Sequence, residues 1–165
     1  MPVLDIITYP HPSLRKRSSE VECVDERVAR LMRDLVETLR ALPGCVGIAA
    51  PQMDRLIRVI VVDVSARKCP NNGLVVLANP RIVRREGEKI GREGCLSLPN
   101  FIGRVKRARK IVTRGLDSNG KSVELCSKGF EAVAVQHEVD HLDGVLFIDR
   151  VSSLKTDVFR RTTNR

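Results

Sequence analysis

The segment 130–142 constrains the fold more than any other, because as a helix it has no continuous polar face. One face carries side chains that recur every three or four residues: Phe130, Val133, Ala134, His137 and His141. A second stripe is apolar and contains Ala132, Val135, Val139 and Leu142. A helix that is apolar on two sides is normally buried. The sequence therefore predicts a central helix, ended at Gly144, that packs between β-sheets.

Two further helices are predicted nearer the ends of the chain. Over residues 25–41 the apolar side chains have helical spacing, and Pro43-Gly44 stops the helix. From Val151 onward a short basic helix is expected. Its stripe of Val151, Leu154 and Val158 would dock it on the surface.

The segments between the helices have the pattern of strands. Residues 57–62 are a β-branched run, typical of a buried strand, and strands are also expected at 75–83 and 87–92, with breaks at Pro80 and Gly87. Residues 110–116 and 121–126 flank an Asn-Gly pair that favours a hairpin. We therefore expect an α+β fold, with antiparallel or mixed sheets around a central buried helix, an N-terminal helix and a C-terminal surface helix.

The composition indicates one globular domain over residues 1–165, because there is no internal repeat and no linker rich in Gly, Ser or Pro. Five scattered cysteines and no N-terminal signal predict reduced thiols and a cytoplasmic location. No apolar run reaches the length of a membrane span. Lys and Arg number 29 against 20 Asp and Glu, and this excess of positive charge favours contact with polyanions.

The central helix contains the pentad His137-Glu138-Val139-Asp140-His141. Residues four apart lie one helical turn apart, so both imidazoles can reach one metal ion. Glu138 is then placed to hold a bound water and accept its proton. The alternative is a pair of core histidines beside a paired glutamate, but burying these groups without a compensating partner is costly.

A catalytic metal needs a third protein ligand and one open position. The residues after His141 include no His or Glu, so the third ligand is expected upstream. His11 lies in a proline-rich turn and is more typical of an exposed residue. Cys95 lies in the loop 93–99, and a His/His/Cys set suits a divalent transition metal.

Three blocks of the chain together resemble the motifs of the peptide deformylase family. These motifs are a glycine-rich AAPQ-type loop, an EGCLS loop and a QHExDHL helix, found here at 45–52, 93–97 and 136–142 in the family's order. The resemblance implies a bacterial cytoplasmic enzyme that removes the formyl group from the N-terminal methionine of new polypeptides. It also implies one divalent metal ion per chain, commonly Fe²⁺, which Zn²⁺, Ni²⁺ or Co²⁺ can replace.

The family motifs imply roles for individual residues of this chain. Cys95, His137 and His141 correspond to the metal ligands, and Glu138 corresponds to the general acid/base. A second group of implied roles surrounds them: hydrogen-bond donors to the developing oxyanion at the Gln52 amide and the Leu96 N–H, a close backbone approach to substrate at Gly47, and support of the loop by Glu93.

An apolar pocket beside the metal is expected to hold the methionine side chain, which is unbranched and polarizable. Its predicted lining comes from the glycine-rich loop and the central helix: Val46, Ile48, Phe130, Val133 and Ala134. Ordinary core packing is the alternative for these residues. Cys45 stands where the family usually has glycine. If that position requires a positive φ, the cysteine costs about 1 kcal/mol unless the turn shifts to Gly44.

Two other functions are compatible with parts of the sequence. A zinc endopeptidase would share the pentad, but would normally have its third ligand downstream. An RNA- or ribosome-binding protein with a structural metal would explain the basic clusters at Arg104, Lys106, Arg107, Arg109 and Lys110 and in the tail at Lys155, Arg160, Arg161 and Arg165. One Tyr and four Phe leave little surface for stacking on bases. A deformylase could also use its basic tail to stay near the ribosome, and specific DNA binding is not expected.

Overall fold

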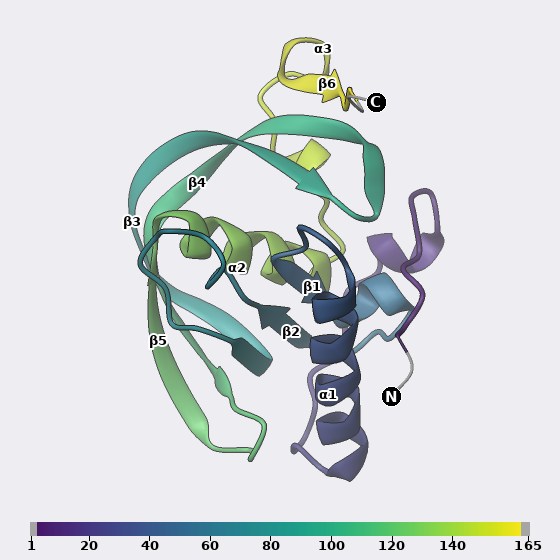
Figure 1. Cartoon of the computed structure of the whole chain (residues 1–165), viewed down its shortest axis with the longest axis vertical. Coiled ribbons are helices and arrows are strands. Elements are labelled where there is room, and N and C mark those ends of the chain that lie inside the picture. The colour runs from purple at the N-terminus through teal and green to yellow at the C-terminus, as the bar shows by residue number, and fades with distance from the viewer. Residues whose placement is uncertain (1–2, 163–165) are drawn as a thin grey trace.

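The computed structural model describes residues 3–162. Its central element is helix α2 (Gly129–Leu142), which lies against the concave side of a curved sheet (Figure 1). Ten of its 14 residues are buried. Two apolar stripes require this burial, because a stripe left in water would not contribute its apolar surface to the hydrophobic stabilisation of the fold.

All strand pairs of the sheet are antiparallel, and the order is β1-β2-β3-β4-β5, with β6 paired to β4. The strands are β1 (Gly47–Ala49), β2 (Val59–Val62), β3 (Val75–Cys95), β4 (Leu98–Leu116), β5 (Ser122–Lys128) and β6 (Val158–Arg160). The predicted α+β class with an antiparallel sheet is confirmed. The Asn-Gly hairpin is confirmed as well, since β4 and β5 pair from Leu116↔Ser122 to Lys110↔Lys128.

Strands β3 and β4 form one long hairpin that curves over α2 (Figure 1). The predicted breaks at Pro80 and Gly87 are wrong, because β3 continues through both. A register shift between Ala78 and Arg81 absorbs the proline as a bulge, and the pairing resumes at Arg81. Gly87 adopts a φ of +63°, which a glycine tolerates, while its neighbours stay paired with β4.

Helix α1 (Glu26–Ala41) agrees with the predicted N-terminal helix. The Asp25 side chain caps it by accepting a hydrogen bond from the Val28 N–H at 2.9 Å. The buried residues Met32, Leu35 and Leu39 pack in one cluster with Ile48, Val59 and Val61 of β1 and β2. The opposite faces of these two strands pack with α2. Strands β1 and β2 are therefore held between the two helices.

The prediction of a C-terminal helix docked by one apolar stripe is wrong in extent. Helix α3 (Leu154–Asp157) has a single turn, and Leu154 is 67% exposed. Strand β6 follows at once, with Phe159 paired to Ile102 of β4. The free edge of β4 offers backbone hydrogen bonds to a β-branched and aromatic segment, and this pairing prevails over the helical pattern.

The fold brings three parts of the chain to one place. The turn 96–97 joins β3 to β4, the glycine-rich loop enters β1, and α2 passes between them. A third core cluster, which includes Leu14, Leu98 and Phe147, lies beside Cys95 at the β3–β4 turn. None of the helices in the described part of the chain has the length and apolar character needed to cross a bilayer.

Candidate active site

Three side chains of types that can ligate a metal ion, which we call the ligand group, meet where the end of β3 contacts α2. The donor atoms of Cys95, His137 and His141 all lie within 4.8 Å of one another, and Cys95 Sγ is 3.2 Å from His141 Nε2. Cys95 and His141 are buried. His11 is not part of this group. It lies in an N-terminal turn, where its Nδ1 accepts a hydrogen bond from the Ser13 N–H. The structure therefore groups Cys95, and not His11, with the two histidines of the pentad.

The ring of His137 is oriented by Glu93. His137 Nδ1 lies 2.9 Å from Glu93 Oε2. Burial alone would raise the pKa of Glu93, but hydrogen bonds from His137 and Arg107 outweigh it and lower the pKa to about 2. Glu93 is thus a carboxylate, His137 Nδ1 donates to it, and Nε2 is left to face Cys95 and His141. A carboxylate behind a histidine ligand is the usual way to hold its tautomer and orientation.

Behind Glu93 lies an arginine network in which Glu93, Arg107 and Asp140 are buried and Arg150 reaches the surface. Arg107 donates to both oxygens of Glu93 at 2.8 and 3.0 Å and to Asp140 at 2.6 Å, and Arg150 donates to Asp140 at 2.7 Å. Arg107 does not support the RNA-binding alternative, since it is only 6% exposed. A charged Asp140 on a buried helix was the available sign that a cationic partner was required.

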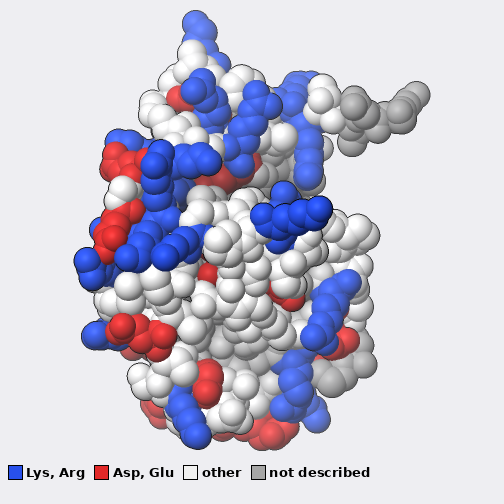
Figure 2. All heavy atoms as spheres, turned by 60° about the vertical axis from the view of Figure 1, so that its left-hand side comes forward, with Lys and Arg blue, Asp and Glu red and all other residues white. Residues whose placement is uncertain are grey.

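The rest of the basic cluster on β4 reaches the surface but is partly neutralised. Lys106 pairs with Glu88 at 2.7 Å, and Lys110 pairs with Glu86 at 3.2 Å. In Figure 2 the Lys and Arg side chains of this face accordingly have Asp and Glu side chains among them. This surface is therefore less basic than the sequence of β4 alone indicates.

Cys95 has the surroundings of a thiolate. Burial would raise the pKa of its thiol, but His141 and His137 lower it well below the ordinary value. A thiolate is the form in which cysteine binds metal ions. The Cys95 sulfur is therefore poised to serve as a ligand at neutral pH.

Glu138 lies between the ligand group and strand β1, and Gly47 is what makes room for it. A Cβ at residue 47 would overlap Glu138 Oε1 and would lie 3.0 Å from its Cγ and Cδ. Burial raises the pKa of Glu138 to about 7. Its Oε2 has no hydrogen-bond partner within residues 3–162. Glu138 thus presents an unpaired oxygen whose proton affinity suits proton transfer near neutral pH.

The side chain of Gln52, in the short helix Ala50–Met53, has a defined orientation. Its Oε1 accepts a hydrogen bond from the Ala49 N–H at 2.9 Å. Its Nε2 therefore points the other way, toward Ser97 Oγ at 3.2 Å and Cys95 Sγ at 3.7 Å. Leu96 follows Cys95 in the β3–β4 turn and lines the same cavity. Two potential N–H donors thus border the ligand group.

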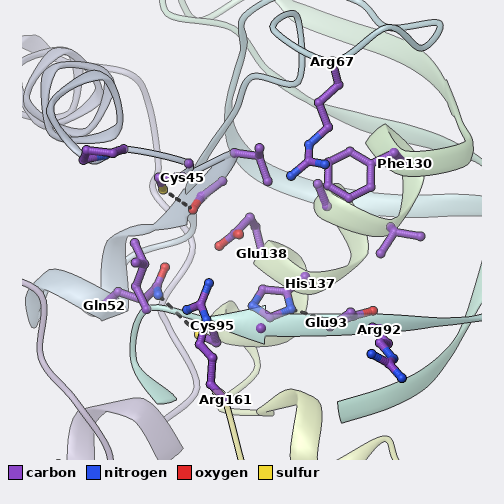
Figure 3. A pocket seen from close by; sticks show the side chains of 18 residues that line it. Cys45, Gln52, Arg67, Arg92, Glu93, Cys95, Phe130, His137, Glu138 and Arg161 are labelled. Carbon is purple, nitrogen blue, oxygen red and sulfur yellow. Dashed lines mark hydrogen bonds and ion pairs between the residues drawn. The ribbon is translucent and has the colours of Figure 1, made fainter. Parts of the chain in front are cut away.

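A cavity of about 320 Å³ opens beside these groups (Figure 3). Four of the five residues predicted for an apolar pocket line it: Val46, Phe130, Val133 and Ala134. The assignment of Ile48 to this pocket is wrong, because its side chain is fully buried in the cluster between α1 and β1. Side chains alternate along a strand, so Ile48 points to the face of β1 opposite to the cavity.

Cys45 causes no backbone strain at its unusual position. The positive φ of this turn, +76°, is at Gly44. Cys45 Sγ donates a hydrogen bond to the Gly47 carbonyl oxygen at 3.2 Å (Figure 3). The turn has thus shifted to Gly44, and the cysteine side chain lines the cavity.

Sequence reasoning missed three arginines that line the cavity. These are Arg67, Arg92 and Arg161, and Arg161 was predicted to belong to a surface tail. Strand β6 brings Arg161 there, and the backbone N–H of Arg161 donates a hydrogen bond to the Asn100 carbonyl oxygen at 2.9 Å. Arg165, also predicted for the basic tail, lies outside the described residues.

A sulfur and two imidazoles beside a buried carboxylate and an open cavity are typical of metal-dependent hydrolases. The chain belongs to the polypeptide deformylase family, whose model matches residues 3–157. It is 46% identical to a peptide deformylase of Syntrophobacter fumaroxidans over 98% of this chain and 94% of the relative. It is 44% identical to a peptide deformylase of Thermodesulfovibrio yellowstonii over 98% and 96% of the two chains.

Solved structures agree with this assignment. A peptide deformylase from Legionella pneumophila is 39% identical and has a TM-score of 0.85, with 93% of this chain and 89% of that one covered. A Met-Ala-Ser-bound peptide deformylase from Acinetobacter baumannii is 34% identical and has a TM-score of 0.83, with 91% and 99% covered. As a member of this family, the chain is an enzyme that removes the N-formyl group from nascent peptides.

Proposed function

We propose that Cys95, His137 and His141 hold one divalent cation and that Glu138 transfers protons during hydrolysis of the formamide of N-formylmethionyl polypeptides. The observation that supports this most is the convergence of three donor atoms within 4.8 Å, next to a buried carboxylate and an open cavity. We further propose that residues 1–165 act as a single catalytic domain, because the ligands come from segments that share one sheet and its buried helix.

The donor set fits a transition metal. The low pKa of the Cys95 thiol favours a thiolate, and the histidines supply nitrogen donors. When bound, a divalent cation would polarise the formyl oxygen and acidify a water molecule. We assign Fe²⁺ as the native ion, with Zn²⁺, Ni²⁺ or Co²⁺ as substitutes, and expect oxidation of the ferrous form and of the thiolate in air.

Glu138 is the proposed base and then acid. Its unpaired oxygen accepts a proton from water as the water oxygen attacks the formyl carbon. The carbon–nitrogen bond then breaks, and Glu138 returns the proton to the leaving amine. The products are formate and a peptide with a free N-terminus, so one water is consumed for each formyl group removed.

Gln52 and Leu96 are proposed to stabilise the charge that develops on the formyl oxygen. The Ala49 hydrogen bond already holds the Gln52 amide with its N–H groups toward Cys95, so no reorganisation is needed during the reaction. The Leu96 backbone N–H would be the second donor. Fixed donors of this kind favour the transition state over the neutral substrate.

The rest of the substrate would lie between the cavity and the edge of the sheet. Val46, Phe130, Val133 and Ala134 would contact the methionine side chain. In the described part of the chain, β1 pairs only with β2, so its other edge is free to bind an extended peptide at Gly47. The Met-Ala-Ser peptide in the Acinetobacter baumannii structure supports a site of this kind.

We also propose that the enzyme works in the cytoplasm, on chains emerging from the ribosome. The exposed side chains of Lys155 and Arg160 would contribute to contact with ribosomal RNA. This basic surface has fewer charges than the predicted tail, because Arg161 lines the cavity instead.

The proposal is tested by anaerobic purification with metal analysis, followed by assays on one peptide in formylated and unformylated forms. We expect about one metal ion per chain, formate from the formylated peptide, and no internal cleavage of either form. Internal fragments without formate would identify an endopeptidase. Formate release at full rate from metal-free protein would contradict the proposed role of the three ligands.

A further inference from the structure

Three arginines from separate parts of the chain surround the mouth of the cavity. Arg67 comes from the segment after β2, Arg92 from β3 and Arg161 from the residue after β6, and all three are exposed. Figure 3 shows them around the site that contains Glu138 and His137. We call these residues the arginine rim.

The arginine rim has no acidic partner. Within residues 3–162, no ion pair involves Arg67, Arg92 or Arg161, whereas Arg58, Arg107 and Arg150 each pair with a carboxylate. Two of the rim guanidinium groups lie instead over aromatic rings: Arg67 is 4.4 Å from the centroid of Phe130, and Arg92 is 5.8 Å from that of Phe159. Such stacking orders a guanidinium while its N–H donors remain free.

The carboxylates of the cavity do not neutralise the rim. Glu93 is engaged by Arg107 and His137. Glu138 is buried beside Gly47, and the proposed mechanism uses its free oxygen. The three exposed arginines therefore give the rim of the cavity a net positive charge.

We infer that the arginine rim selects nascent chains with Asp or Glu shortly after the formylmethionine, an inference that rests on the proposed function. When the formyl end reaches the buried Glu138, the residues after the formylmethionine extend toward solvent, where the exposed rim lies, because an extended chain advances about 3.3 Å per residue. Guanidinium groups bind carboxylates with paired, charge-assisted hydrogen bonds. Basic side chains at the same positions are repelled.

The test uses the metal-loaded enzyme and formylated tetrapeptides that carry Asp, Asn or Lys at the second or the third position. We expect kcat/KM to follow the order Asp, Asn, Lys in at least one series, with about a three- to tenfold difference between Asp and Lys. The difference should lie mainly in KM, and it should shrink between about 0.02 M and about 0.3 M salt, because salt screens exposed charges.

Charge reversal at the rim provides the matched comparison. In a variant with Arg92→Glu and Arg161→Glu, the preference should reverse, so that the Lys peptide is the better substrate. The control is Arg17→Glu with Arg27→Glu, which makes the same change in net charge at exposed positions that do not line the cavity. The control should keep the wild-type order.

The outcomes separate the two proposals. No formate from any peptide would contradict the proposed function itself. Formate released at equal rates from all peptides, or fastest from the Lys peptides, would overturn the role of the rim and leave the function intact. Equal rates combined with inhibition by a short RNA would assign the arginines to phosphate binding, and would overturn the inference as well. If the double variant does not fold, the salt dependence of the wild-type preference decides.

Discussion

Arginine has opposite surroundings on the two sides of the candidate active site. Behind the ligands, Arg107 has 5% of its side chain exposed and holds Glu93 and Asp140 together. In front of them, Arg67, Arg92 and Arg161 are exposed and have no acidic partner in the part of the chain that the structure describes. One group of charges is fully occupied by the protein, and the other is available to a ligand.

The difference shows that burial decides whether an arginine positions other groups of the protein or remains free to bind a ligand. A buried guanidinium must be paired, because an unpaired charge in the interior costs several kcal/mol. Its bonds then keep Glu93, and through it His137, in one orientation. An exposed guanidinium has no such requirement, because water solvates it, and its N–H groups remain available to a ligand. Substitutions at the proposed ligands, which lie between the two groups, and at their neighbours test this contrast.

Loss of a ligand should have the largest effect. In Cys95→Ala only two histidines remain, so we expect a metal content well below one per chain and no measurable formate release. Elemental analysis and a formate assay on anaerobically purified protein would show this. Cys126→Ala, at an exposed free thiol, is the matched control and should bind metal normally. Full metal content in the Cys95 variant would contradict its assignment as a ligand.

Loss of the proton-transfer group should spare the metal. Glu138→Gln keeps the shape of the side chain but cannot accept the proton, so we expect kcat to fall by about 10³-fold or more with unchanged metal content. Glu124→Gln, at an exposed residue of β5, is the control and should keep the wild-type kcat. If the Glu138 variant retained more than a tenth of the wild-type kcat, another group would have to be the base.

Breaking the arginine network should destabilise the fold. Arg107→Leu leaves Glu93 and Asp140 without their shared partner, and we expect the free energy of unfolding to fall by about 3–5 kcal/mol. The comparison is Arg114→Leu, which removes an exposed ion pair with Glu124 and should cost about 0–1 kcal/mol. Urea unfolding of both variants measures the two values. Equal losses would mean that Arg107 is not the structural centre of the network.

Crowding Glu138 should have a smaller effect on activity. The methyl group of Gly47→Ala would overlap Glu138 Oε1, so Glu138 must move. We expect about a 10- to 100-fold loss in kcat/KM with little loss of metal, because a small displacement of a positioned group has effects of this size. Gly91→Ala is the control, since a methyl group there meets nothing within 4 Å. A fully active Gly47 variant would show that the space is not needed.

The smallest effect is expected in the tail. Reversing the charge of Lys155 and Arg160 should weaken sedimentation with ribosomes by a few-fold, and the effect should decline as salt rises. Lys121→Glu with Lys128→Glu, on exposed residues at the ends of the β5 segment, is the control. Unchanged sedimentation at low salt would contradict a ribosomal contact through the tail.

Local patterns predicted much of the fold and some of the site. Periodicity located α1 and α2, and the Asn-Gly pair located the β4–β5 hairpin. The same patterns failed where backbone pairing was decisive. Pro80 did not end β3, because a bulge absorbed it, and Val158 joined a strand because β4 had a free edge there.

The sequence by itself determined that two histidines four residues apart share one helical face with a carboxylate between them, because helix geometry relates residues within one turn. The family motifs pointed to Cys95, 46 residues before His141, but only the tertiary structure shows that its sulfur lies beside the two histidines. It also shows that Arg107 is buried while Arg161 lines the cavity. Strand alternation shows that neighbouring side chains point to opposite faces, but it does not show what covers each face. That depends on how the long hairpin curves over α2, which is set by packing along the whole chain.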